Sequence, residues 1–317
     1  MGKIVALGEV VADIYRSESE FTVEMRFNAK PGGAPANVAV AASRLGAEAA
    51  FVGSVGDDLF GNFIMEALRA EGVDTNGVRR CEPPTRTTLA FVEIDDEGDR
   101  EFTFYRSDPA ADELLSPDDI SEELLRGASF VNFGSIPLIK DPVASATMEL
   151  ARLADESGVS VAFDVNLREH LWESLDAARE AVDPLFDVSR IVKLSDDELS
   201  PLLGVDNVDE AAEVLLERGV ELVLVSLGPA GAFYATSTFS GKVPGFEVEV
   251  VDATGAGDAF LAATLAHLSD HDTFDEETVR GASQRGTAAG AFACTDYGAM
   301  SALPTSNELE QFIQQRG

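Results

Sequence analysis

The sequence predicts a single α/β domain in which a doubly wound, mostly parallel sheet is flanked by helices and carries a small β-sheet lid. Three times along the chain, a segment of helical periodicity ends near a glycine and leads into a run rich in valine, leucine or alanine. Such a unit is the crossover connection of a parallel sheet that is buried on both faces. Because these units recur instead of forming separate blocks of helices and strands, the sheet is expected to be doubly wound.

The predicted elements follow in chain order, and glycines mark several of their ends. Helices are expected at 37–46, which ends at Gly46, at 61–73, with a stop at Gly72, at 144–159 and at 208–220. Strands are expected at 3–11, 49–56, 160–166 and 221–228. The last segment is predicted to be a terminal helix with Thr305 or Ser306 as its N-cap.

Two stretches do not follow this alternation. Residues 87–106 contain two β-rich arms joined by the acidic turn DDEG, which predicts a hairpin. Residues 14–30 are polar and extended, without helical periodicity. Both insertions, about 14–30 and 87–107 of one domain that spans 1–317, follow early strands, so we expect them to pair into a small separate sheet. Such a sheet can act as a lid, as a homodimer surface or as both, and a monomer is the alternative.

The charge of the chain restricts its partners. The formal net charge is −34, which excludes nucleic acid and anionic membranes as general partners because such a surface repels both. Only five of the 23 basic residues are lysine. An acid-rich, lysine-poor surface is typical of a halophilic protein, since concentrated salt screens the self-repulsion. An ordinary acidic cytoplasmic protein is the alternative.

Other features of the composition predict a cytoplasmic location. No run of 18 apolar residues is present, so no membrane span is expected. The apolar N-terminus lacks a basic region and is interrupted by Glu9 and Asp13, so it is interpreted as a strand rather than a signal peptide. The two cysteines, Cys81 and Cys294, favour neither a disulfide framework nor a zinc site.

The stretch DATGAGDAF (252–260) precedes an apolar helical pattern, so its glycines lie at a helix N-terminus. Unpaired amides and the helix dipole bind anions there, and Gly255 and Gly257 let the backbone approach an oxyanion closely. Asp258 falls in the first turn of this helix. A carboxylate there is either a favourable helix-terminal residue or a general base beside an anion hole, as hydroxyl attack on a phosphoryl group requires. The chain contains no P-loop motif.

In a second glycine-bearing stretch, PGGAPANVAVAASRLG (31–46), the glycines precede the helix expected at 37–46. Gly32 and Gly33 again allow close approach of the backbone. Asn37 lies near the helix start, where it is either an N-cap or an amide that hydrogen-bonds a polyol.

Together these two stretches resemble the signature motifs of the PfkB (ribokinase-like) carbohydrate kinases. Further segments agree with that family in order and spacing: GEVVAD (8–13), VGDDLFG (55–61) and SLGPAG (226–231). The resemblance spans about residues 3–304. It implies a ribokinase-like fold and a kinase that uses ATP with Mg²⁺, together with a monovalent cation such as K⁺.

Several segments are most similar to the fructokinase-like members of that family, which implies that the product is fructose 6-phosphate. They are FYRSDPAAD (104–112), FGSIPLI (133–139), DVNLREHLW (164–172) and KLSDDE (193–198), together with GGAPANVA from the second glycine-bearing stretch. The nearest alternatives are 2-keto-3-deoxygluconate kinase, which shares a D-x-N-x-R segment, and ribokinase. The context of Asp112 and the REHLW segment favour fructokinase.

The resemblance also implies roles for individual residues around the sugar. Asp258 would deprotonate the primary hydroxyl of the sugar, and the backbone amides of Gly255, Ala256 and Gly257 would stabilise charge on the transferring phosphoryl group. The expected sugar contacts are Asp13, Gly32, Gly33, Asn37, Arg106, Asn166 and Arg168. The two arginines are alternatively surface partners of the abundant carboxylates.

On the nucleotide side, the resemblance implies contacts from Lys193, Ser195, Ser226, Gly228 and Gly231. Glu198 would organise Mg²⁺ through water, although Ser195 stands where the family pattern has asparagine, which leaves the role of that position open. A monovalent cation would bind mostly through backbone carbonyls near Asp252, Thr254, Ala293, Asp296 and Gly298, unless this loop binds no ion.

Two other functions have less support. A non-catalytic sugar- or nucleotide-binding protein on the same fold would be favoured by a lost base, but Asp258 and its glycines are present. A dinucleotide-dependent oxidoreductase is disfavoured because no G-x-G-x-x-G fingerprint follows the first predicted strand.

Overall fold

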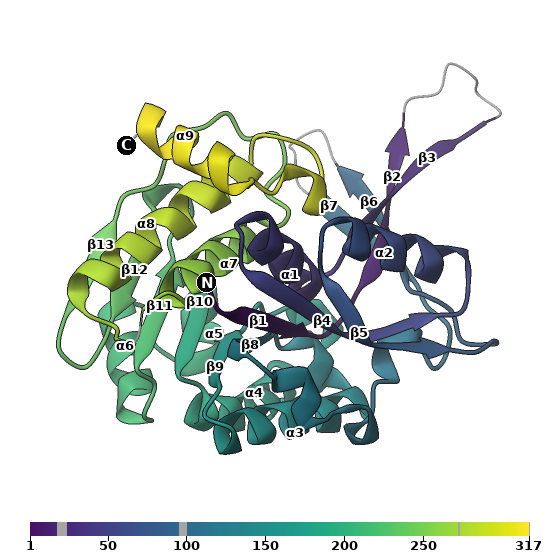
Figure 1. The fold of residues 1–317 in the computed structure, drawn as a ribbon, viewed down its shortest axis with the longest axis horizontal. Helices are drawn as coiled ribbons and strands as arrows, with labels where there is room; N and C mark the ends of the chain where they lie inside the picture. Colours follow the sequence, from purple (N-terminus) through teal and green to yellow (C-terminus); the bar gives the residue numbers. More distant parts are fainter. Residues whose placement is uncertain (18–23, 95–99, 272, 317) are drawn as a thin grey trace.

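The protein is built around a nine-stranded sheet, seen in a computed structural model that describes residues 1–17, 24–94, 100–271 and 273–316 (Figure 1). The strand order is β13-β12-β11-β10-β9-β8-β1-β4-β5. All neighbours are parallel except β11–β12 and β12–β13, which are antiparallel. The strands are β1 (Lys3–Leu7), β4 (Glu48–Gly56), β5 (Asp74–Cys81), β8 (Ala128–Phe133), β9 (Ser160–Asp164), β10 (Ile191–Ser195), β11 (Leu222–Ser226), β12 (Ala232–Ala235) and β13 (Ser240–Val243).

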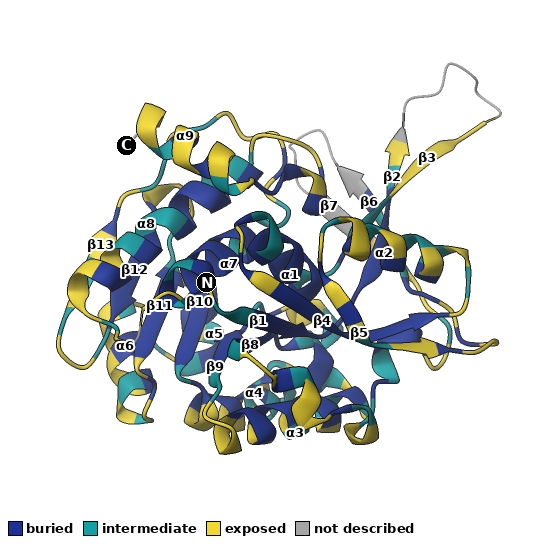
Figure 2. Cartoon of the chain, viewed as in Figure 1, coloured by how far each residue is buried: buried dark blue, intermediate teal, exposed yellow. Residues whose placement is uncertain are grey.

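Helices cover both faces of this sheet, which confirms the predicted doubly wound α/β fold. Alternate strand residues point to opposite layers, so Ile4 and Ala6 belong to one hydrophobic core and Val5 and Leu7 to the other. One layer holds α1 (Ala34–Arg44), α2 (Leu59–Ala70), α7 (Ala256–Leu268), α8 (Glu276–Ala293) and α9 (Ser306–Arg316). The other holds α3 (Val143–Glu156), α4 (Leu175–Val188), α5 (Asp196–Leu203) and α6 (Val208–Glu217). Figure 2 shows the central strands buried between the two layers.

Short 3-10 segments complete the connections. They are η1 (Ala111–Glu113), η2 (Pro117–Asp119), η3 (Glu122–Leu125), η4 (Ile136–Ile139), η5 (Glu169–Leu171), η6 (Gly228–Ala230) and η7 (Met300–Ala302).

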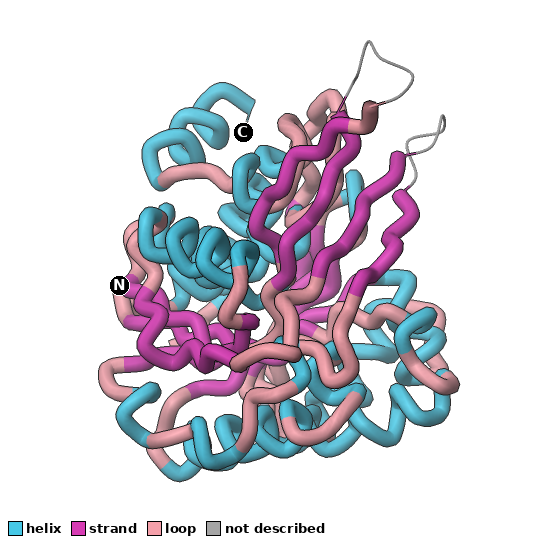
Figure 3. The backbone as a smooth tube through the Cα atoms, turned by 90° about the vertical axis from the view of Figure 1, so that its right-hand side faces the viewer, coloured by secondary structure: helices cyan, strands magenta, loops and turns pink. Residues whose placement is uncertain are grey.

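The two insertions form a second, four-stranded sheet that projects from the main body (Figure 3). Its order is β3-β2-β6-β7, with bounds Arg26–Gly32, Val11–Ser17, Leu89–Ile94 and Arg100–Tyr105. The hairpin pairs β2–β3 and β6–β7 are antiparallel, and β2 and β6 join them in parallel. We call these four strands the lid sheet. The predicted DDEG turn at 95–98 lies outside the described residues.

The prediction of one strand over 3–11 is wrong. The strand β1 ends at Leu7, and the chain enters the lid sheet at Val11, so Asp13 lies on β2 instead of closing the first strand of the main sheet. At Gly8, with φ +151°, an added Cβ would lie 2.6 Å from the Pro35 side chain, so only glycine fits this crossing. The apolar pattern hides the break because residues on both sides of it are buried.

Element ends differ from the predictions by a few residues. The helix expected at 37–46 begins earlier, at Ala34, because Pro35 is tolerated in a first helical turn, where its missing N–H is not needed. The Thr305 hydroxyl accepts from the Glu308 amide, as expected of an N-cap. Among the described residues, no helix is long and apolar enough to span a bilayer. Cys81 and Cys294 do not form a disulfide.

Candidate active site

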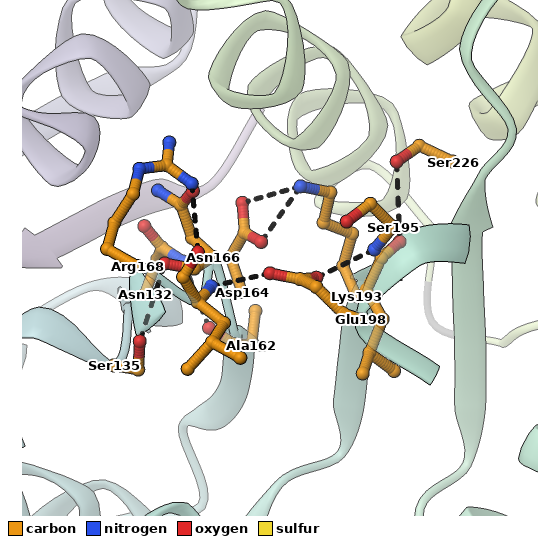
Figure 4. Close-up of polar contacts among 12 residues, drawn as sticks. Asn132, Ser135, Ala162, Asp164, Asn166, Arg168, Lys193, Ser195, Glu198 and Ser226 are labelled. Carbon is orange, nitrogen blue, oxygen red and sulfur yellow. Dashed lines mark hydrogen bonds and ion pairs between the residues drawn. The ribbon is translucent and has the colours of Figure 1, made fainter. Parts of the chain in front are cut away.

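The carboxyl ends of neighbouring parallel strands bring a row of polar residues together. Asp164 ends β9, Ser195 ends β10 and Ser226 ends β11, while Lys193 lies within β10 (Figure 4). Beside this row, between β8 and β1, the sheet reverses its winding, because β1 lies between β8 and β4. In open α/β sheets, ligands bind outside the carboxyl ends of the strands at such a switch point.

Asp258 reaches this edge from the first turn of α7. Its side chain is 7% exposed, and its Oδ2 accepts a hydrogen bond from Nδ2 of Asn37 at 2.7 Å. The N-cap of α7 is Gly255, in the left-handed region with φ 81°, and no side chain caps the helix. Because the Asp258 carboxylate bonds to another helix instead of to its own helix terminus, the interpretation as a simple helix-terminal residue loses its support.

Asn37 is not an N-cap either. It lies inside α1, where its backbone N–H donates to the Gly33 carbonyl at 2.9 Å. Its side-chain Nδ2 contacts the candidate base, and its Oδ1 is buried without a hydrogen-bond partner among the described residues. A buried acceptor without a donor is costly, so the amide is suited to receive a hydroxyl.

The start of α7 is placed close to the polar row. A Cβ added to Gly257 would lie 3.0 Å from Nζ of Lys193, and one added to Gly255 would lie 3.0 Å from the Ala299 side chain. The Ala256 amide donates to the Ala253 carbonyl at 3.3 Å, within the turn that starts the helix. The first amides of a 13-residue helix can therefore meet an anion beside a lysine.

Lys193 and Asp164 form a buried ion pair beneath this helix start. Nζ lies 2.9 and 3.1 Å from the two carboxylate oxygens, and both side chains are about nine-tenths or more buried. Burial opposes the charge on Lys193, but the nearby carboxylates, Asp164 first, hold its pKa above the ordinary value. The lysine is therefore a fixed cation at the floor of the site.

The lid sheet contributes Asp13 and Gly32, and Gly33 follows as the N-cap of α1. Burial, reinforced by the charge of Asp252, raises the pKa of Asp13 to about 7. A Cβ on Gly32 would lie 2.1 Å from Oδ2 of Asp13. Gly33, with φ +108°, would place a Cβ 2.4 Å from the Glu9 carbonyl. Both glycines thus make room for neighbouring protein groups.

The three remaining predicted sugar contacts surround the same edge. Asn166 follows β9 with φ 43°, a left-handed conformation. Arg168 donates to the Leu167 carbonyl at 3.1 Å (Figure 4). Burial raises the pKa of Asp258, and the charge of Arg168 is one of the effects that oppose this rise. Arg106 lies 3.6 Å from Asp112. Arg106 is therefore a carboxylate partner, as the alternative interpretation expects, but its partner Asp112 is buried and does not lie on the surface.

On the predicted nucleotide side, Glu198 is engaged by the protein itself. Its two carboxylate oxygens accept from the backbone amides of Leu167 and Ser195, so it joins the loop after β9 to the start of α5. Ser226 donates weakly to the Leu194 carbonyl at 3.4 Å. An added Cβ meets nothing within 4 Å at Gly228, whereas at Gly231 it would overlap the Val243 carbonyl.

The predicted cation loop is held together by Asp252. Its Oδ1 accepts from the Thr254 amide at 2.7 Å and its Oδ2 from the Gly298 amide at 2.8 Å. Its own amide faces the carbonyl of Cys294, the residue after Ala293. Asp296 instead accepts from the adjacent Tyr297 amide. The fold thus brings Asp252, Thr254 and Gly298 of the predicted cation site together.

Residues 1–306 match the model of the pfkB family of carbohydrate kinases. The chain belongs to this family. It is 42% identical over 318 residues to probable fructokinase-2 from Arabidopsis thaliana, and the alignment covers 99% of this chain and 96% of that protein. A solved fructokinase from Vibrio cholerae O395, with fructose, ADP and calcium ion bound, is 34% identical with a TM-score of 0.89 and covers 99% of each chain. An aminoimidazole riboside kinase from Salmonella enterica is 33% identical with a TM-score of 0.85, covering 98% of this chain and 99% of that one.

Three buried carboxyls of this PfkB kinase were not among the predicted site residues. Asp164 pairs with Lys193, Asp112 accepts from the Thr88 hydroxyl and faces Arg106, and Glu9 accepts from the Ala34 amide at 3.1 Å. Each lies inside a segment that already marked the resemblance, but an acidic residue next to a strand carries no sign of burial. Their hydrogen-bond partners Ala34, Thr88 and Lys193 lie more than 20 residues away along the chain, so only the fold reveals these contacts.

Proposed function

We propose that this kinase transfers the γ-phosphoryl group of ATP to the primary hydroxyl at C6 of fructose, giving fructose 6-phosphate. The observation that carries the proposal is the buried Asp258 carboxylate, bonded to Asn37 and set beside the helix start that faces Lys193. Attack by a hydroxyl needs a base next to an anion-binding site, and this arrangement supplies both. Relatives named as fructokinases over nearly the whole chain favour fructose as the acceptor.

Asp258 accepts the proton of the attacking hydroxyl in this proposal. Burial raises the pKa of Asp258, while the Asn37 hydrogen bond and the charges of Lys193 and Arg168 oppose that rise. Because the net direction is upward, the ionised carboxylate is a better proton acceptor than an exposed aspartate.

The start of α7 and Lys193 stabilise the phosphoryl group. The amides that start α7, including those of Gly257 and Asp258, and the helix dipole act on its negative charge. Lys193 adds a fixed cation at the same place. The nucleotide itself would lie along the ends of β10 and β11, over Ser195, Ser226 and the open Gly228.

Mg²⁺ is expected to arrive with the nucleotide. Within the described ranges, no group of three or more His, Cys, Asp or Glu side chains is arranged to hold a metal. That fits an ion that keeps several waters and is held largely by substrate phosphates. Glu198 and Asp164 would hold it through water, and the bound ion neutralises charge on the phosphates. A monovalent cation would use carbonyl oxygens around Asp252, whose carboxylate already orders that loop.

The proposal is tested by measuring ATP consumption with fructose, 2-keto-3-deoxygluconate, ribose, aminoimidazole riboside and adenosine, beside the Asp258→Asn variant. We expect fructose to be preferred and kcat to fall about 10²–10⁴-fold in the variant. Asp209→Asn, which removes a carboxylate from the first turn of α6, is the matched control and should keep full activity. Turnover of another sugar with the same loss would retain the base and overturn fructose. Intact nucleotide binding without any turnover would indicate a binding protein instead.

A homodimer through the lid sheet is part of the proposal. Phe27 and Tyr105 are 43% and 61% exposed, and the Phe91 ring contacts both of them. Exposed aromatic clusters on a projecting sheet favour association with a second copy. Light scattering on the wild type and on Phe27→Ser/Tyr105→Ser decides the matter: a dimer that becomes a monomer supports it, and a wild-type monomer overturns it.

A further inference from the structure

A small, partly open cavity lies beside the candidate active site. Its volume is about 30 Å³, and its walls include Glu9, Arg106, Asp112, Ile136, Pro137 and Lys140. These residues come from the end of β1, the segment after the lid hairpin and η4. A cavity of this size holds about one or two water-sized groups, so it suits one hydroxyl-bearing end of a ligand instead of a whole ring.

Glu9, one of the residues that line this cavity, has an unsatisfied carboxyl oxygen. Glu9 is 7% exposed, and its Oε1 accepts from the Ala34 amide at the start of α1. Its Oε2 is buried and has no hydrogen-bond partner among the described residues. Buried polar atoms nearly always have a partner, so this oxygen indicates a group that enters from outside the protein.

Glu9 is connected to the reacting end of the site through α1. The carbonyl of Glu9 lies against Gly33, directly before the helix whose Asn37 binds the base Asp258. The charges of Asp112 and Asp258 both raise the pKa of Glu9, so Glu9 lies within electrostatic reach of each. The cavity therefore lies against the start of the same helix whose Asn37 contacts Asp258.

We propose that this cavity is the subsite for the end of the ketose opposite the phosphorylated carbon, with the C1 hydroxyl bonded to Oε2 of Glu9. The inference rests on the proposed fructose kinase activity. It adds Glu9, which is not among the predicted sugar contacts, as a specificity-determining residue beside Arg106, which is one of them.

The charges around the cavity select a neutral hydroxyl over a carboxylate. The two cations are already paired: Arg106 lies 3.6 Å from Asp112 and 3.9 Å from Glu113, and Lys140 lies 2.9 Å from Glu113. Glu9 adds a third carboxyl without a cation of its own. A sugar acid with its carboxylate at this end would therefore be repelled, which disfavours 2-keto-3-deoxygluconate.

The protonation of Glu9 also suits a hydroxyl. Burial raises the pKa of Glu9 to about 7, against the opposing hydrogen bonds from its own backbone and from Ala34. Near neutral pH the carboxyl is partly protonated, so it can donate to a hydroxyl oxygen as well as accept from a hydroxyl hydrogen.

The test compares fructose with 1-deoxy-D-fructose, which lacks only the C1 hydroxyl, in the wild type, Glu9→Met and Glu9→Gln. In the wild type we expect kcat/KM to fall about 10–100-fold for the deoxy sugar, as loss of one hydrogen bond to a buried polar group predicts. Glu9→Met should lower kcat/KM for fructose by a similar factor. It should leave kcat/KM for the deoxy sugar within about threefold of the wild-type value, because that sugar has no C1 hydroxyl to bond Glu9. Glu9→Gln retains a donor and an acceptor and should restore most of the preference.

Equal losses for both sugars in Glu9→Met would overturn the proposal, because they indicate a structural role. If that variant does not fold, the wild type decides: a preference below about fivefold overturns the subsite, and a larger one supports it. A wild type that prefers 2-keto-3-deoxygluconate also overturns it. The subsite and the proposed function fail in different ways. Equal use of fructose and 1-deoxy-D-fructose overturns only the subsite, whereas no use of any ketose overturns the proposed function.

Discussion

Nδ2 of Asn37 lies 2.7 Å from Oδ2 of Asp258, although 221 positions separate the two residues in the chain. This hydrogen bond joins the first turns of α1 and α7, the two helices that follow the glycine-bearing stretches. It holds the candidate base in one orientation and donates to its ionised form. The two signature stretches therefore form one functional unit.

Replacing Asn37 is expected to change the pH dependence of the reaction. A hydrogen bond to the ionised carboxylate lowers the pKa of Asp258, against the larger effect of burial. Asn37→Leu should therefore raise that pKa further. Because the base must be unprotonated, the acid limb of kcat/KM should move to higher pH.

The pH profile of kcat/KM for the sugar measures this shift. Asn132→Leu removes another buried amide, one that donates to the Ala162 carbonyl, and should leave the acid limb in place. An unchanged limb in Asn37→Leu would contradict the assignment of Asp258 as the base.

Gly32 is expected to be required for sugar binding. A Cβ at this position would lie 2.1 Å from Oδ2 of Asp13, so Gly32→Ala must displace that carboxyl. Loss of one hydrogen bond to a buried carboxyl predicts a KM for the sugar about 10–100-fold higher, with the KM for ATP unchanged. Gly127→Ala is the control, because its Cβ meets nothing within 4 Å and its strain is remote from the site. Equal effects on both substrates would mean that the change distorts the site generally.

Removal of Lys193 is expected to destabilise the fold as well as the site. Lys193→Met leaves the buried Asp164 carboxylate without its cation, which typically costs about 3–5 kcal/mol. Denaturant unfolding measures the loss, and the double variant Lys193→Met/Asp164→Leu should recover part of it. Arg152→Met, which breaks exposed pairs with Glu149 and Glu156, should leave the unfolding free energy unchanged. No recovery in the double variant would show that packing of the lysine stem matters more than its charge.

Glu9 is expected to make stability depend on pH. Its pKa is about 7 in the folded protein, above the usual value, so the stability that its neutral form contributes is present at pH below about 4.5 and lost as pH rises through 7. Glu9→Gln stays neutral throughout. Relative to the wild type, the variant should gain up to about 3 kcal/mol between pH 5 and 8.

Urea unfolding of both proteins across that range checks the prediction. The difference between the two proteins isolates Glu9 from the many other carboxylates. A constant difference would contradict a raised pKa for Glu9.

Salt is expected to stabilise the protein. A net charge of −34 opposes the compact state through self-repulsion, and the Debye length falls to about 3 Å at 1 M salt. The thermal midpoint should therefore rise steadily between about 0.1 and 3 M KCl. Sucrose at matched osmolarity controls for general exclusion of solutes, and a midpoint that does not rise with KCl would contradict adaptation to salt.

Several features were predictable because local chemistry decides them. The crossover units, the glycines that allow close backbone approach, and the helix start that carries Asp258 are all determined by residues within a few positions of one another. At Gly33 and Gly255 the φ angles are positive, so the backbone there favours glycine over residues with a Cβ. The order of these motifs along the chain was enough to predict the family.

Other features were not predictable, because they depend on contacts between distant segments. The apolar run at 3–11 reads as one strand, and only packing at Gly8 shows that it divides between two sheets. Glu198 was predicted to organise Mg²⁺ through water, and the structure shows in addition that its two oxygens accept from the amides of Leu167 and Ser195. A hydrogen-bond partner 31 residues away leaves no trace in local composition.

The sequence by itself therefore determined the fold class and the two glycine-bearing helix starts, one of which carries the candidate base Asp258, since backbone sterics and periodicity act over short distances. Only the tertiary structure decided which carboxyls are buried, which of them are paired and which oxygen of Glu9 is left for a ligand. The physical reason is that desolvation and pairing set the charge and pKa of an acidic side chain, and both depend on neighbours that folding brings together.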